Sequence, residues 1–193
     1  MKTAHSTEGR RQEMIRNILT VATGLAAEGG GQLSMGAIAK AGKISVVALR
    51  EAFPTVEALV DALYLDLCRQ KNVVIQTQHD PIQSLIERAF AIWHGHVTWA
   101  QNNPAANMAL NHLNLANSPS DKARTIEALN FPDAEIAEQF AANEIFDDCD
   151  PMYADALVIA IVDTTVQLIR LCPDQEQHHL RTGFLLVQRL LLQ

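Results

Sequence analysis

Apolar residues recur along this chain mainly at intervals of three and four positions, the spacing that places them on one face of an α-helix. No stretch alternates apolar and polar residues as a half-buried strand does, and no internal repeat is present. The pattern predicts an all-α fold, with a polar N-terminal segment of about ten residues before the first helix. The expected helices cover about 10–28, two short segments within 33–53, and about 56–76, 80–102, 104–117, 121–129, 133–146, 152–171 and 174–192.

The segment 33–59 predicts two short helices joined by a tight turn. Their apolar positions are Met35, Ile38 and Ala39 in the first helix, and Val46, Leu49 and Phe53 in the second. Gly42-Lys43 interrupts the pattern between them, and Ser45 is a good N-cap for the second helix. Pro54 ends that helix and Thr55 caps the next one. Two short helices with a Gly-containing turn form a helix-turn-helix, whose second helix can lie in the major groove of DNA.

This part of the chain resembles the N-terminal domain of the TetR family of bacterial repressors over about residues 11–64. The matching positions are Ile15-Arg16-Asn17-Ile18-Leu19, Ala22, Leu25, Gly29 or Gly30, Ser34-Met35, Ile38-Ala39, Ile44-Ser45, Phe53 and Glu57-Ala58-Leu59. The resemblance implies an N-terminal three-helix helix-turn-helix domain at 1–55 and a C-terminal helical ligand-binding and dimerisation domain at 56–193. It further implies a transcriptional regulator that responds to a ligand, most simply a repressor released by a small molecule.

The chain departs from the family pattern at several positions of the motif. Gly42-Lys43 replaces the usual Ala-Gly, Val46-Val47 a small polar pair, Arg50 a Tyr, Ala52 a His or Tyr, and Val56 a Lys. Several side chains that the family uses on phosphate are therefore absent. An alternative hypothesis is that the head has lost specific DNA recognition, and that the protein is a dimeric binder of a ligand or of another protein.

Charge is distributed unevenly along the chain. The net charge is −7 overall, but residues 1–55 carry seven Lys or Arg against four Asp or Glu. Because neutralising DNA phosphates depends on local basic charge, this excess favours DNA binding by the N-terminal part. Arg10, Arg11 and Arg16 near the first helix are either phosphate contacts or a solvated face, and the sequence leaves both open.

The resemblance implies which side chains of the motif meet a palindromic DNA operator. The candidate DNA-binding residues are Ser34, Lys40, Lys43, Ser45, Val47, Ala48 and Arg50. Arg50 is the long donor of the second helix and can reach a guanine edge or a phosphate. Val47 and Ala48 can contact thymine methyl groups, and the two lysines can hold phosphates.

The two expected helices at 152–171 and 174–192 are apolar almost all round. A helix of this kind must be buried on nearly every side. A second subunit can supply the missing side, which predicts a homodimer held by a four-helix bundle, as the family resemblance also implies. Complete burial inside one monomer is the other interpretation.

Isolated polar residues on apolar helix faces favour a small-molecule site in the C-terminal part. The candidate ligand-binding residues are Trp93, His96, Met108, His112, Asp163 and Gln167. His96 and His112 each share a face with apolar neighbours, and Asp163 interrupts the apolar helix at 152–171. Each of these polar groups can equally be a satisfied contact between helices. The resemblance implies that an unidentified effector bound in this part controls DNA binding.

Enzyme signatures are missing from the sequence, which has no Gly-rich phosphate loop, nucleophile elbow or Glu-x-x-His pair. We therefore expect no enzyme, although a helical enzyme that uses His96 or His112 as a base remains a third hypothesis. His94 and His96 point in different directions on a helix. Cys68, Cys149 and Cys172 lack metal-ligand spacing. We expect neither a metal nor a cofactor.

No segment of the chain suggests a membrane partner. The longest aliphatic run, 157–162, is far too short to span a bilayer. The N-terminal segment lacks the apolar stretch of a signal peptide. A cytoplasmic location is expected by default.

Overall fold

The computed structural model describes residues 2–116, 118–141 and 151–191. Its described part is all-α, as predicted. The helices are α1 (Lys2–Glu28), α2 (Met35–Gly42), α3 (Val46–Ala52), α4 (Val56–Gln76), α5 (Leu85–Asn102), α6 (Pro104–Leu115), α7 (Asp121–Leu129), α8 (Ala134–Ala141), α9 (Pro151–Leu171) and α10 (Glu176–Leu191). A short 3-10 helix, η2 (Pro173–Gln175), joins the last two.

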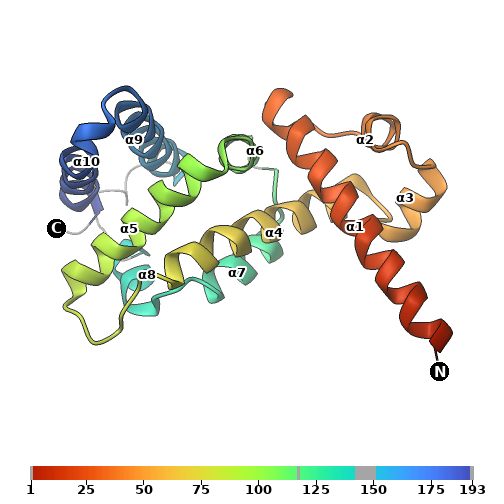
Figure 1. Cartoon of the computed structure of the whole chain (residues 1–193), viewed down its shortest axis with the longest axis horizontal. Coiled ribbons are helices and arrows are strands. Elements are labelled where there is room, and N and C mark those ends of the chain that lie inside the picture. The colour runs from red at the N-terminus through yellow and green to blue at the C-terminus, as the bar shows by residue number, and fades with distance from the viewer. Residues whose placement is uncertain (1, 117, 142–150, 192–193) are drawn as a thin grey trace.

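Helices α1, α2 and α3 gather at one end of the molecule, and the remaining helices form a larger body at the other (Figure 1). The head closes over Ile18, Ile38 and Leu49, which are fully buried. Helix α4 leaves the head and runs along the body, where it packs against α5, α6 and α7. We call α1–α3 the head and α4–α10 the body.

Two predicted helix starts are wrong. Helix α1 begins at Lys2, although the polar composition placed its start near residue 10. Helix α5 begins at Leu85, although Asp80-Pro81 was expected to start it. Ser84 and Glu87 form a capping box at Leu85, with Glu87 accepting from both the N–H and the hydroxyl of Ser84. The Asp80 carboxylate instead accepts from the Ile82 N–H, which holds this segment in a turn outside the helix.

The other helix boundaries agree closely with the expected ones. Gly30 and Gly31 follow α1 with positive φ values of 63° and 83°, which explains why the triple glycine ends that helix. Helix α8 is described to Ala141, and the rest of the predicted stretch to 146 lies outside the described residues. Cys68 is buried and Cys172 half-buried, whereas Cys149 also lies outside the described part.

Two glycines allow the body helices to approach each other closely. A Cβ on Gly95 of α5 would lie 2.7 Å from the Cα of Ile75 on α4. A Cβ on Gly183 of α10 would lie 2.6 Å from the Trp93 ring and closer still to the Thr165 hydroxyl. These contacts bring α4, α5, α9 and α10 together around one core. Within the described ranges, no helix is both long and apolar enough to cross a membrane.

Candidate DNA-binding surface and effector pocket

Each helix of the helix-turn-helix begins at a serine cap. Ser34 caps α2 by accepting from the Ala37 N–H at 3.2 Å, and Ser45 caps α3 by accepting from the Ala48 N–H at 3.1 Å. Lys43 follows α2 with a φ of 53°, in the left-handed region where glycine is usual. Lys43 therefore adopts the left-handed turn conformation although it is not a glycine.

Helix α3 buries one face and leaves the opposite face open. Leu49 and Phe53, four residues apart, are buried in the core of the head, whereas Val47 is 68% exposed. Of the predicted DNA-binding residues, Ser34, Lys40, Lys43, Ser45, Val47 and Arg50 are exposed and Ala48 is half-buried. The open face of α3 therefore presents a hydroxyl, a guanidinium and two valine side chains, those of Val46 and Val47.

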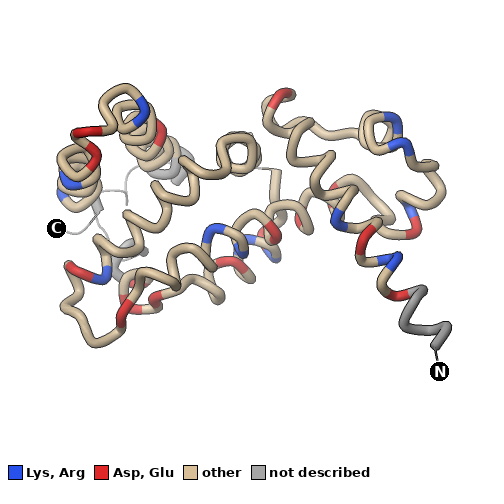
Figure 2. The backbone as a smooth tube through the Cα atoms, in the orientation of Figure 1, with Lys and Arg blue, Asp and Glu red and all other residues tan. Residues whose placement is uncertain are grey.

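Basic side chains occur on all three helices of the head. Figure 2 shows Lys and Arg positions on α2 and near the end of α3, with further ones along α1. Arg11 and Arg16 of α1 are exposed. Acidic residues interrupt this basic surface, because Glu13 on α1 and Glu51 on α3 are exposed as well. The head thus offers scattered cations rather than one dense basic patch.

Trp93, the first of the predicted effector residues, packs between two helices of the body. Its ring is buried, and its indole N–H donates to the Leu180 carbonyl of α10 at 3.0 Å. Gly183 lies against the same ring, as described above. Trp93 therefore joins α5 to α10.

The two predicted effector histidines occupy different environments. Burial, with a smaller contribution from Lys71, lowers the pKa of His96 to about 3, so its imidazole is neutral at neutral pH. His112 of α6 places Nδ1 3.0 Å from the Ala26 carbonyl of α1. Because a carbonyl only accepts, Nδ1 carries the proton in this contact. His112 therefore joins the body to the end of α1.

Asp163 of α9 is held by two buried asparagines of α6. Asn107 donates to its carboxylate at 2.9 Å and Asn111 at 3.3 Å. The two remaining candidates differ from this cluster in being exposed to solvent: Met108 is 50% exposed, and Gln167 is exposed as well. The asparagines were missed in the sequence, although two amides spaced four residues apart on one helix are a recognisable signal.

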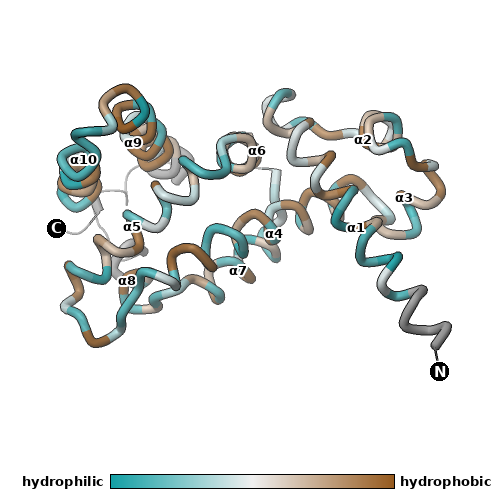
Figure 3. Tube along the Cα trace, viewed as in Figure 1, coloured by the Kyte–Doolittle hydropathy of each residue, from teal (hydrophilic) through white to brown (hydrophobic). Residues whose placement is uncertain are grey.

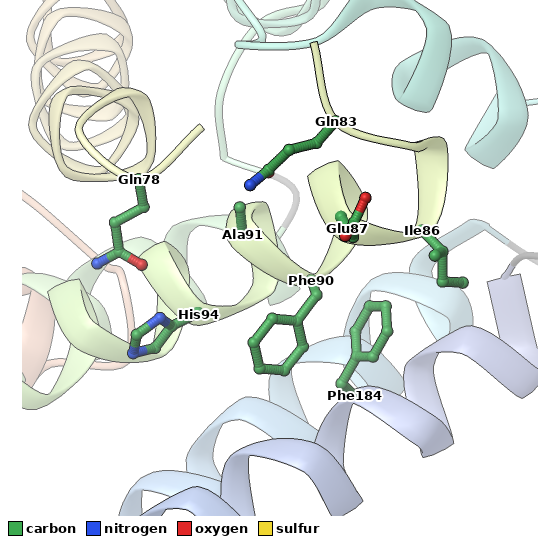
Figure 4. A pocket seen from close by; sticks show the side chains of 8 residues that line it. All are labelled: Gln78, Gln83, Ile86, Glu87, Phe90, Ala91, His94 and Phe184. Carbon is green, nitrogen blue, oxygen red and sulfur yellow. The ribbon is translucent and has the colours of Figure 1, made fainter. Parts of the chain in front are cut away.

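A pocket of about 430 Å³ opens beside α5 (Figure 4). Its lining residues are Gln78 and Gln83 from the α4–α5 turn, Ile86, Glu87, Phe90, Ala91 and His94 from α5, and Phe184 from α10. None of the six predicted effector residues lines it, and their assignment stays a prediction. A second pocket, of about 450 Å³, lies between the end of α1 and the start of α2 and includes Ser34. The first pocket could not be read from the sequence, because Phe90 and Phe184 meet only through folding.

A network of ionic side chains braces the α4–α5 turn from the side of α8. The Asp133 carboxylate contacts His79 Nε2 and Arg88 Nε, each at 2.8 Å. Its other oxygen accepts from the Ile136 N–H and so caps α8. Arg88 also pairs with Glu135 and donates to the Gln83 carbonyl. The turn that supplies two pocket residues is therefore fixed to α8.

Asp133 is expected to make stability fall in acid. Burial acts to raise the pKa of Asp133, but hydrogen bonds from His79, the Ile136 N–H and Arg88 outweigh it and hold the pKa below its ordinary value. Such a carboxylate stabilises the fold above its unfolded pKa of about 3.9, and the gain is lost as pH falls through the lower folded value. Asp133→Asn should lower the free energy of unfolding by about 2 kcal/mol at pH 7. In thermal denaturation, this difference from the wild type should shrink toward pH 3.

Asp66→Asn is the matched control for this prediction. Asp66 pairs at 2.7 Å with Arg69, whose side chain is 68% exposed. Loss of such a surface pair should change the free energy of unfolding by less than about 0.5 kcal/mol. A deficit of Asp133→Asn that stays constant from pH 7 to pH 3 would show that the carboxylate charge is not its source.

The described part of the chain joins an exposed helix-turn-helix in the head to a helical body. No protein-family model matches the chain. Among solved structures, the chain is similar to a protein from Shewanella sp. PV-4 described as a "putative tetR family transcription regulator". The similarity has a TM-score of 0.68 and 20% sequence identity, and it covers 90% of this chain and 95% of the other. This confirms the TetR-like fold that the sequence resemblance predicted.

Proposed function

We propose that this protein is a ligand-responsive transcriptional regulator that binds DNA through α3, as a repressor released by a small molecule. The observation that carries the proposal is the capped helix-turn-helix with an open α3 face, set on a body whose fold matches a TetR-type structure. Two α3 helices, one from each subunit, would enter major grooves about one DNA turn apart. Residues 1–55 act as the DNA-binding domain and 56–193 as the effector and dimerisation domain. A cytoplasmic, non-enzymatic role follows from this proposal.

The outer faces of α9 and α10 support a homodimer. The exposed leucines on these helices are Leu157, Leu168 and Leu171 of α9 and Leu185 and Leu186 of α10. Figure 3 shows strongly hydrophobic segments along both helices. Burying a leucine stabilises an association by about 1.5–3 kcal/mol. Exposed Gln167 lies one turn before exposed Leu171 on α9, so in a dimer built this way it belongs to the subunit interface.

Effector binding in the body would change the position of the heads. Helix α4 starts directly after the head and runs through the body, and α1 contacts α6 through His112 and Ala26. A ligand that binds better when these helices are displaced favours the arrangement of the two heads that fits DNA poorly. The coupling is reciprocal, so DNA should weaken effector binding by the same factor.

The proposal is tested with Arg50→Ala. Purified protein is mixed with genomic DNA fragments at two salt concentrations, and retained fragments are sequenced. The wild type should enrich a palindromic site, less strongly at higher salt. Removing the guanidinium should weaken binding to that site about tenfold or more, because one base-edge contact supplies about 1–3 kcal/mol.

Arg69→Ala is the control for Arg50→Ala, because Arg69 is an exposed arginine in the half of α4 that lies away from the head. It should leave DNA binding unchanged. The second candidate function, a dimeric binder without specific DNA recognition, is favoured by the exposed Val46 and Val47 on α3. Retention without an enriched site, unaffected by Arg50→Ala, would support that function and reject the proposed one.

A further inference from the structure

The structure points to a binding site for small aromatic cations in the pocket formed by the α4–α5 turn, α5 and α10. We propose that this pocket takes an aryl group that carries a positively charged, N–H-donating head. The ligand class follows from three properties of the pocket, namely its aromatic wall, its unpaired acceptor and its carboxylate.

The aromatic wall consists of Phe90, His94 and Phe184. Phe90 and Phe184 meet edge to face, with ring centroids 5.2 Å apart and planes at 82°. His94 lies along α5 beside Phe90, with centroids 6.1 Å apart and planes at 27°. Figure 4 shows the two phenyl rings side by side, from α5 and α10. Aromatic faces of this kind attract both flat rings and cations.

Gln78 supplies an acceptor that the described part of the protein leaves without a donor. Its Oε1 atom is buried and has no hydrogen-bond partner there. A buried acceptor without a donor costs about 1–3 kcal/mol, so a donor that reaches it is favoured by a similar amount. Gln78 lines the pocket directly after α4, above His94 in the view of Figure 4. A rotation of the Gln78 side chain, which lines the pocket, would present this oxygen to a donor on an occupant.

Glu87 gives the pocket its negative charge. Hydrogen bonds from the hydroxyl and the N–H of Ser84 hold the carboxylate at the start of α5 and lower the pKa of Glu87. It is the one carboxylate among the residues that line the pocket. An anionic head is disfavoured beside either this carboxylate or the Gln78 oxygen, whereas a cationic head with N–H groups is favoured at either position.

The size of the pocket fits a small molecule better than a protein partner. A volume of about 430 Å³ lies near the lower end of the range of ligand pockets. The pocket also lies on the inner side of α10, because Phe184 is buried toward α5 whereas Leu185 and Leu186 are exposed. A second copy that covered those leucines would leave the pocket open to a ligand.

Benzamidine tests the proposal, because it joins a phenyl ring to a cationic, N–H-donating head. Benzoate has the same ring with a negative head, and benzyltrimethylammonium has a positive head without N–H groups. Calorimetry and NMR of the full-length protein should show saturable benzamidine binding at millimolar or lower concentration, with shifts at the Gln78 and Gln83 amides. Benzoate should bind at least about tenfold more weakly, equivalent to about 1.4 kcal/mol.

Two variants separate the contributions of charge and hydrogen bonding. Glu87→Gln keeps a side chain that can complete the capping box and should weaken both cations about fivefold or more. Gln78→Met removes the acceptor and should weaken benzamidine while leaving benzyltrimethylammonium unchanged. Glu57→Gln, which changes the equivalent first-turn glutamate of α4, is the control and should bind like the wild type.

Equal affinity for benzamidine and benzoate, or no saturable binding of benzamidine, would overturn the proposal. Binding that is insensitive to both Glu87→Gln and Gln78→Met would overturn it as well, because the ligand would then lie elsewhere. A link between this pocket and DNA binding rests on the proposed function, but the binding measurements use no DNA. Failure of the pocket and failure of the proposed function are therefore distinguishable.

Discussion

Gly95→Ala should lower the free energy of unfolding by about 2 kcal/mol, which corresponds to roughly 4–8 °C in Tm for a chain of this length. The added methyl group would lie 2.7 Å from the Ile75 Cα and 3.0 Å from its Cγ1. A backbone atom cannot rotate away as a side chain can, so α4 and α5 must separate locally. The gain in helix propensity, about 1 kcal/mol, offsets only part of this cost. Thermal and urea denaturation of the full-length protein measure the difference.

Gly24→Ala is the matched control in the same experiment. Gly24 lies within α1, and a Cβ added there meets no heavy atom within 4 Å. This variant should be more stable than the wild type by about 0.5–1 kcal/mol, because only the propensity gain remains. If both variants shifted Tm upward, the close crossing of α4 and α5 at Gly95 would be refuted.

Leu185→Glu combined with Leu186→Glu should convert the proposed homodimer to a monomer. Both leucines are about half exposed on α10 and would be covered in a two-fold symmetric interface. Each substitution removes apolar burial, and symmetry brings the new carboxylates of both subunits into one interface, where they repel. Dimer affinity should fall at least about a hundredfold, or about 2.7 kcal/mol. Sedimentation equilibrium at micromolar concentration measures the change.

Leu129→Glu controls for a general effect of adding charge. Leu129 is 81% exposed on α7 and carries no part of the proposed interface. This variant should keep the wild-type mass in solution. A wild-type protein that sediments as a monomer, or a double variant that remains dimeric, would contradict the assignment of α9 and α10 as the interface.

The fold was predictable from the sequence where helix signals are local. Ser34, Ser45 and Thr55 each cap the helix that the pattern placed after them, and Val56–Gln76 was predicted to the residue. The start of α5 was wrong because Asp80-Pro81 resembles a helix start. The capping box that begins at Ser84 is the stronger signal and sets the start of the helix.

Much of the candidate site could not be predicted, because it depends on contacts between distant segments. Exposure of the α3 residues follows from helical periodicity, and the structure agrees except at Ala48, which is half-buried. The pocket depends instead on α10 crossing α5, which brings Phe184 to Phe90. His112 shows the same limitation, since its position on an apolar face gave no sign that the Ala26 carbonyl was its partner.

The contact between α1 and α6 also bears on how the molecule folds. Gly31 lies against the backbone of His112, and His112 in turn binds the Ala26 carbonyl, so head and body share a packed boundary. A cut at residue 55 would separate the two proposed functional domains, but it would break this packed boundary. The end of α1 packs against α6, which is synthesised some eighty residues later. The head therefore reaches its final stability only after this part of the body has been made.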